Sequence, residues 1–117
     1  MIEGCIMTKG LIIKEPWVSL IVEGKKTWEL RKTKTSIRGK IALLQGGYIR
    51  GYANLVDCIG PIPLERLREA SHLHQVPIER FTEGYSYKYA WKLINVESVD
   101  PPEKYDHPRG AQQWVNL

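Results

Sequence analysis

The segment that decides the fold reads Glu15-Pro-Trp-Val-Ser-Leu-Ile-Val-Glu-Gly24 and continues as Lys25-Lys-Thr-Trp-Glu-Leu-Arg31. In its first half Trp17, Leu20 and Ile21 recur at the 3.6-residue period, which predicts a short amphipathic helix. Proline is tolerated in the first turn of a helix, and glycine commonly follows the last turn. The proline and the glycine of this segment therefore mark the two ends of the helix.

The second half of the segment alternates with the two-residue period of a strand. Thr27, Glu29 and Arg31 project to one side of this strand, whereas Trp28 and Leu30 project to the other. The chain is therefore predicted to leave the helix, turn, and enter a strand at once, with the acid and the arginine on one face.

Four further segments have the apolar or alternating composition of strands: 11–14, 40–45, 49–59 and 87–99. The run 40–45 is apolar enough for a strand buried on both faces, and Gly51 indicates a bulge or a close approach in the next strand. Short helices are predicted at 64–70 and 77–84. We expect an irregular stretch over 100–110 and a closing helical turn within 111–117.

This balance of elements predicts a mixed α+β fold dominated by strands. Several strands in a chain of 117 residues must pack as a sandwich or curl into a barrel, and one amphipathic helix can plug the end of a barrel. We expect a partly closed β-barrel of five to six strands with two or three short helices.

The composition predicts one domain in a cytoplasmic protein. A chain with 43% hydrophobic residues can bury a core without disulfide or metal staples. Cys5 and Cys58 form no CxxC pattern, which favours a reducing compartment and argues against a structural zinc. No apolar run approaches the roughly 20 residues of a membrane span, and residues 1–7 do not resemble a signal peptide. We expect a single domain over 8–117 and a marginal or disordered N-terminal extension over 1–7. Met7 is an alternative translation start.

Positive charge is concentrated in residues 24–40. This stretch holds seven basic residues and one acid, so its net charge is +6, whereas the ten basic and twelve acidic residues elsewhere sum to −2. Focused charge raises the local concentration of a polyanion and speeds its capture. A solvated basic loop is the ordinary alternative.

Lys26, Glu29 and Arg31 place one acid between two bases within six residues. Arg31 could hold the Glu29 carboxylate and leave Lys26 to meet a phosphate or a polarised carbonyl. The alternative is an ordinary same-face ion pair between Glu29 and Arg31, worth under about 1 kcal/mol.

The same residues complete the pattern G-x-K-x-x-E-x-R, which resembles the signature of the ASCH (activating signal cointegrator homology) family. Three other stretches are similar to the coactivator branch of that family: Pro16-Trp-Val-Ser-Leu-Ile21, Gly51-Tyr-Ala-Asn-Leu-Val-Asp-Cys58 and Ala90-Trp-Lys-Leu93. The similarity covers about residues 10–96. It implies a PUA-like fold, a cleft beside the motif, and RNA- or DNA-related roles.

Some bacterial members of the family remove the acetyl group from N4-acetylcytidine, and others have been proposed as ribonucleases. The amidohydrolase branch resembles G-[RK]-K-T-x-T-x-R, in which the lysine and the second threonine are the catalytic candidates. Lys26 and Thr27 fit this pattern, whereas Glu29 stands at the second threonine. A further glutamate of that branch lies in the later helical region, where Glu79 or Glu83 could serve.

We therefore predict a protein that binds nucleic acid, in particular RNA, through a basic cleft. The predicted contact residues are Trp17, Lys25, Lys26, Glu29, Arg31, Lys32, Lys34 and Arg38. Tyr85 and Tyr87 are among the aromatic residues that could stack on bases. The alternative is a hydrolase acting on an acylated nucleoside or a ribonuclease, with Lys26 and Glu29 as catalytic residues. A protein-interaction module is the third possibility.

No cofactor and no metal site is predicted, since His72 and His74 have the wrong spacing for a helical metal pair. The predicted partner is RNA, another nucleic acid or a nucleoside-like small molecule. No binding to a membrane is predicted. The oligomeric state stays open.

Overall fold

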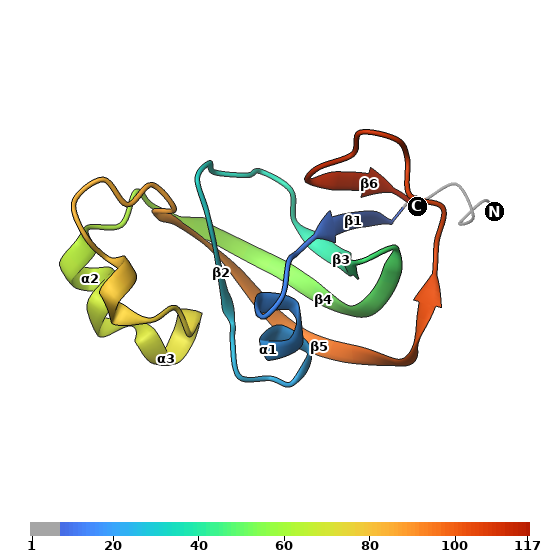
Figure 1. Cartoon of the computed structure of the whole chain (residues 1–117), viewed down its shortest axis with the longest axis horizontal. Helices are drawn as coiled ribbons and strands as arrows, with labels where there is room; N and C mark the ends of the chain where they lie inside the picture. The colour runs from blue at the N-terminus through green and yellow to red at the C-terminus, as the bar shows by residue number, and fades with distance from the viewer. Residues whose placement is uncertain (1–7) are drawn as a thin grey trace.

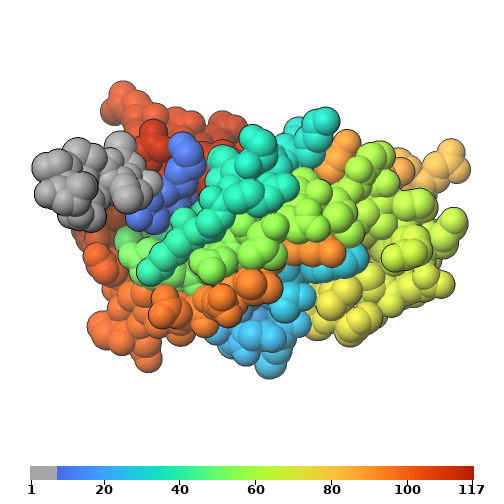
Figure 2. Space-filling view, turned by 180° about the vertical axis from the view of Figure 1, so that it is seen from behind, coloured from blue at the N-terminus to red at the C-terminus, as the bar shows by residue number. Residues whose placement is uncertain are grey.

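Six strands form one continuous sheet in the computed structural model, which describes residues 8–117 (Figure 1). The strands are β1 (Lys9–Ile12), β2 (Trp28–Arg31), β3 (Gly39–Gln45), β4 (Tyr48–Ile59), β5 (Tyr89–Lys104) and β6 (Trp114–Asn116). Their order across the sheet is β2-β5-β4-β3-β1-β6. Only β1 and β3 are parallel; the other neighbours are antiparallel. Seen from behind, β3, β4 and β5 run side by side across the surface (Figure 2).

Within residues 8–117, three short α-helices and one 3₁₀ turn accompany the sheet. They are α1 (Trp17–Val22), α2 (Leu64–Glu69), α3 (Ser71–His74) and the turn η2 (Ile78–Arg80). Helix α1 packs on the sheet, whereas α2 and α3 lie together at one end of the molecule (Figure 1). The mixed, strand-dominated class with six strands and three helices is confirmed. The predicted extension over 1–7 lies outside the described residues.

The sheet curls but does not close into a barrel. Its edges are β2 and β6, which are not paired with each other. The Arg31 guanidinium on β2 donates a 2.8 Å hydrogen bond to the carbonyl of Ile12 on β1. A side chain therefore spans the gap that a closed barrel would fill with a strand ladder, and the β-barrel prediction is correct only in part.

Helix α1 buries Val18 and Ile21 in the main core, against Leu43, Leu55 and Trp91. The predicted face of this helix is shifted, because Trp17 and Leu20 are only half-buried and Val18 takes the central position. The predicted end is correct: the glycine after the helix has a φ of +81°, a conformation that side chains rarely adopt. Trp17 packs against this core and also against a second cluster that contains Leu67 and Phe81.

The apolar strand β3 is buried at four consecutive positions, as its composition predicted. Gly51 on β4 is a close-approach point, since a Cβ there would lie 2.6 Å from the carbonyl oxygen of Glu97. The prediction that regular structure ends at residue 99 is wrong, because β5 continues to Lys104. Ile49 pairs with Glu103 and Gly51 with Ser98, so the two prolines of β5 fall in a bulge, where their missing N–H groups cost no ladder bond.

Two other predictions are wrong in type. Residues 114–116 form strand β6 instead of a helical turn, because β1 offers a free edge to which they pair antiparallel. The helix predicted over 77–84 is only the turn η2, and α3 precedes it. None of the helices within residues 8–117 is long and apolar enough to cross a membrane.

Candidate functional site

A cavity of about 330 Å³ opens beside β2. Its walls come from the segment between β1 and α1, from β2 itself, and from the residues between α3 and β5. Trp17, Lys26, Glu29 and Arg31, four of the eight predicted contact residues, line it together. The structure therefore brings these four predicted residues together at one cavity.

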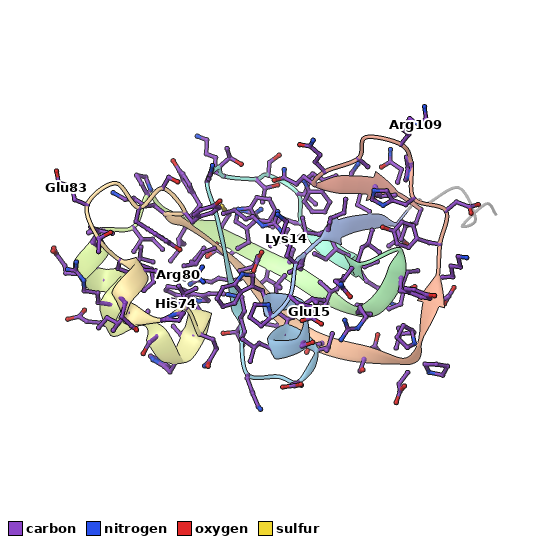
Figure 3. The ribbon with its side chains drawn as sticks, viewed as in Figure 1. Lys14, Glu15, His74, Arg80, Glu83 and Arg109 are labelled. Carbon is purple, nitrogen blue, oxygen red and sulfur yellow. The ribbon has the colours of Figure 1, made fainter. Side chains whose placement is uncertain are left out.

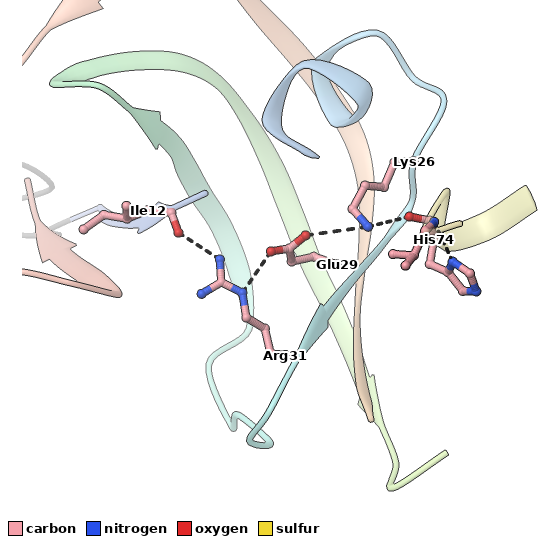
Figure 4. A network of polar contacts seen from close by, with 6 residues as sticks. Ile12, Lys26, Glu29, Arg31 and His74 are labelled. Atoms are coloured by element: carbon pink, nitrogen blue, oxygen red, sulfur yellow. Dashed lines mark hydrogen bonds and ion pairs between the residues drawn. The ribbon is translucent and has the colours of Figure 1, made fainter. Parts of the chain in front are cut away.

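Glu29 is the centre of a polar network in the wall of this cavity (Figure 4). Arg31 Nε donates a 2.9 Å hydrogen bond to Glu29 Oε2, and Lys26 Nζ lies 3.7 Å from Glu29 Oε1. The same-face geometry predicted for Glu29 and Arg31 is thus confirmed. The Glu29 residue is only 5% exposed, and its carboxylate lies between two cations.

Local backbone geometry brings Lys26 to this position. After α1 the backbone N–H groups of Lys25 and Lys26 both bond the carbonyl of Leu20, which folds the chain back under the helix. Thr27 N–H then donates to the carbonyl of Leu73, joining the start of β2 to α3. Lys26 therefore points inward between α1 and α3.

The Lys26 ammonium is buried, with 1% of the residue exposed. It donates a 2.6 Å hydrogen bond to the backbone carbonyl of His74 and lies 4.9 Å from the centre of the Trp17 ring. Burial lowers the pKa of Lys26 from 10.5 to about 8, and the nearby Glu29 carboxylate only partly opposes this shift. The sequence predicted that this ammonium would meet a phosphate of the ligand. In the structure it instead bonds a backbone carbonyl of the protein itself.

The His74 ring fixes the carbonyl to which Lys26 binds. The backbone N–H of Val76 donates a 2.9 Å hydrogen bond to His74 Nδ1, so this nitrogen carries no proton. The other nitrogen, Nε2, then carries the proton and donates it to the carbonyl of Leu67 at 2.6 Å. Burial lowers the pKa of His74, which agrees with a neutral ring.

Aromatic side chains from the segment before β5 also line the cavity. Phe81 packs edge-on against Tyr85 at 4.9 Å between ring centres, and Tyr85 lies 5.7 Å from Tyr87. Tyr85 and Tyr87 line the cavity. Burial raises the pKa of Tyr85 to about 12, so its phenol stays neutral at physiological pH.

The other four predicted contact residues do not line the cavity. Lys25 pairs with Glu23 at 3.3 Å, and Arg38 donates hydrogen bonds to backbone carbonyls of its own loop. Lys32 is exposed, but its ammonium lies 5.1 Å from the Tyr87 ring centre. Lys34 is exposed as well. The basic stretch therefore reaches the site through Lys26 and Arg31, with Lys32 beside the rim.

Two cationic residues of the cavity, Lys14 and Arg80, are not among the contact residues predicted from the sequence. Lys14 ends the predicted strand 11–14 and Arg80 stands in a predicted helix, and no periodicity links either to the motif. The glutamates considered beside Arg80, Glu79 and Glu83, are exposed and do not line the cavity. Within residues 8–117, no three side chains of His, Cys, Asp or Glu gather where they could hold a metal ion.

Comparisons with known proteins agree with this fold. The family model of the ASCH domain matches residues 11–103. The crystal structure of ASCH from Zymomonas mobilis superposes with a TM-score of 0.75 at 17% identity, covering 94% of this chain and 87% of that one. Serine-to-alanine and tyrosine-to-phenylalanine mutants of the same Zymomonas mobilis protein, both 17% identical, give TM-scores of 0.73 and 0.74 over 94% of this chain and 87% and 89% of theirs. No curated protein sequence matches the chain.

Proposed function

The chain belongs to the ASCH domain family, and on that premise we propose that it binds single-stranded RNA and holds one base in the cavity beside Glu29. The observation that carries this proposal is the Glu29 carboxylate, held between Lys26 and Arg31 in the wall of a cavity with aromatic sides. Sequence-specific RNA recognition usually acts on unstacked bases, which are read by hydrogen bonds and aromatic stacking.

The size of the cavity suits one nucleotide. Small-molecule sites in proteins usually enclose about 300–1,000 Å³, and this cavity of about 330 Å³ is at the lower end. A duplex cannot enter such a space, whereas a base turned out of a single strand can. Stacking on side chains such as Tyr85 and Tyr87 contributes about 1–3 kcal/mol per base.

The Glu29 carboxylate gives the site a preference among bases. A carboxylate offers about four acceptor sites; the hydrogen bond from Arg31 uses one of them, and the Lys26 ammonium lies 3.7 Å from the other oxygen. The remaining capacity suits the exocyclic amino group of cytosine or adenine. We therefore expect oligonucleotides of cytidine or adenosine to bind more tightly than oligouridine.

Binding of single-stranded RNA, followed by fluorescence anisotropy at two salt concentrations, tests the proposal. Wild-type protein should bind oligocytidine or oligoadenosine more tightly than oligouridine. Glu29→Gln should reduce this preference, because an amide has fewer acceptor sites, and Glu65→Gln, on the exposed surface of α2, should leave it unchanged. Equal affinities of the wild-type protein for all three oligonucleotides would contradict the proposal.

Hydrolysis of an acylated nucleoside is the second candidate, and one observation favours it. Burial lowers the pKa of Lys26 to about 8, so a fraction of this lysine is an uncharged base or nucleophile at neutral pH. Incubation with N4-acetylcytidine decides the matter, because hydrolysis adds water to the amide and releases acetate and cytidine. Turnover that is lost in Lys26→Met would support a hydrolase. Absence of turnover in a protein that binds RNA would contradict the hydrolase candidate.

A further inference from the structure

The cations that line the cavity fall into two pairs. Lys26 and Arg31 are engaged by the protein: each faces Glu29, and each donates to a backbone carbonyl, that of His74 or of Ile12. Their hydrogen-bond donors are directed to protein groups before any ligand arrives. A ligand anion would gain little from them.

Lys14 and Arg80 form the other pair, and both are exposed at the cavity. In the part of the chain that the structure describes, neither forms an ion pair. The Arg80 guanidinium lies over the Trp17 ring, 5.8 Å from the ring centre. These two cations are therefore free to meet a ligand.

The two residues approach from different parts of the chain. Lys14 lies between β1 and α1, and Arg80 ends η2, with β2 between them in Figure 3. Glu29 is the acidic residue among those lining the cavity, against four cations, so the lining carries a net charge of +3. Such a cleft concentrates anions.

We propose that Lys14 and Arg80 form a phosphate subsite at the mouth of the cavity, so that the site takes phosphorylated nucleotides in preference to nucleosides. This inference rests on the proposed function. The aromatic lining accepts a planar base, while the two free cations that line the same cavity accept the phosphate attached to it. It also moves the phosphate contact away from Lys26, to which the motif had assigned it.

The test compares each nucleoside with its 5′-monophosphate by isothermal titration calorimetry, using cytidine and adenosine. The monophosphate should bind wild-type protein at least tenfold more tightly than the nucleoside, as charge-assisted hydrogen bonds add affinity. Arg80→Gln and Lys14→Gln should each remove most of this difference. The matched controls Arg109→Gln and Lys104→Gln, which alter exposed residues outside the cavity, should retain it.

A second measurement separates this inference from the RNA proposal. For a single-stranded RNA oligonucleotide, log affinity falls linearly with log salt concentration. Arg80→Gln and Lys14→Gln should each make this fall less steep, by about 0.7 in the slope. RNA binding with an unchanged slope in both variants, or equal affinity for nucleoside and monophosphate, would overturn the phosphate subsite and leave RNA binding intact. Tight binding of monophosphates through Arg80 without binding of the oligonucleotide would support the subsite and overturn the RNA proposal.

Discussion

The Lys26 ammonium donates a 2.6 Å hydrogen bond to the backbone carbonyl of His74, 48 residues further along the chain. This bond joins the ASCH motif to α3 and sets the wall of the cavity. Burial of the ammonium is expensive, which is why its pKa falls to about 8. A buried lysine that costs stability at neutral pH is more easily explained by a function at the cavity than by the fold.

Lys26→Met tests this cost through the pH dependence of stability. In the folded protein the pKa of Lys26 is about 8, whereas in the unfolded chain it is near 10.5. Between these values the unfolded chain binds more protons, so folding becomes more favourable as the pH rises. Between pH 7 and pH 10 the wild-type protein should gain on the order of 2 kcal/mol in unfolding free energy relative to Lys26→Met.

Urea unfolding at both pH values measures this gain. Lys34→Met, at an exposed position, is the control and should follow the wild-type profile. A constant difference between the wild-type protein and Lys26→Met would show that the ammonium is not desolvated.

His74→Asn should remove an acid-sensitive component of stability. The neutral ring accepts a hydrogen bond from Val76 N–H, and burial holds the pKa of His74 below 6.5 in the folded state. Since the unfolded chain binds the proton first, stability should fall as the pH drops below about 6.5. Thermal unfolding between pH 7 and pH 5 should show a smaller loss in His74→Asn than in the wild-type protein.

The neighbouring His72 provides the control for this experiment, because it is exposed on the same helix. His72→Asn should lose stability in acid as the wild-type protein does. If both variants behave alike, the His74 ring is not the group responsible.

Arg31→Lys should weaken the link between the edge of the sheet and β1. The guanidinium bonds Glu29 through Nε and the carbonyl of Ile12 through a terminal nitrogen, a fork that one ammonium cannot reproduce. We expect a loss of about 1–3 kcal/mol in unfolding free energy. Arg38→Lys, whose guanidinium is exposed in a loop, should change stability by less than about 0.5 kcal/mol.

Gly51→Ala should destabilise the protein by crowding the contact of β4 with β5. The added Cβ would lie 2.6 Å from the carbonyl oxygen of Glu97 and 3.0 Å from a methyl group of Val22. Overpacking of this kind costs about 1–3 kcal/mol. Chemical denaturation measures the change, and stability equal to that of the wild-type protein would mean that the strands separate there without cost.

The sequence predicts best what depends on local periodicity. The glycine after α1 and the alternation in β2 were enough to place Glu29 and Arg31 on one face. Neither could reveal that Lys26 is buried, because its partner carbonyl belongs to His74 in α3. Arg80 was missed for the same reason. It reaches the cavity from the turn η2, whose position depends on how α2, α3 and η2 pack together.

The errors in secondary structure also come from long-range pairing. Strand β6 forms because β1, at the other end of the chain, leaves an edge free, and three residues carry too little pattern to predict a strand. The continuation of β5 past Pro101 and Pro102 depends on a bulge against β4, which no local propensity indicates.

The central claim, that an RNA base enters the cavity, is tested most directly by ¹⁵N NMR of the tryptophan indole groups during titration with single-stranded RNA. Trp17 lines the cavity, whereas Trp114 lies on β6 and stacks on Trp91. The indole resonance of Trp17, assigned with Trp17→Phe, should shift until it saturates, and that of Trp114 should stay in place. Shifts confined to the backbone amides of Lys32, Lys34, Arg38 and Lys40 in the same ¹⁵N spectra, with the Trp17 resonance unmoved, would contradict the account.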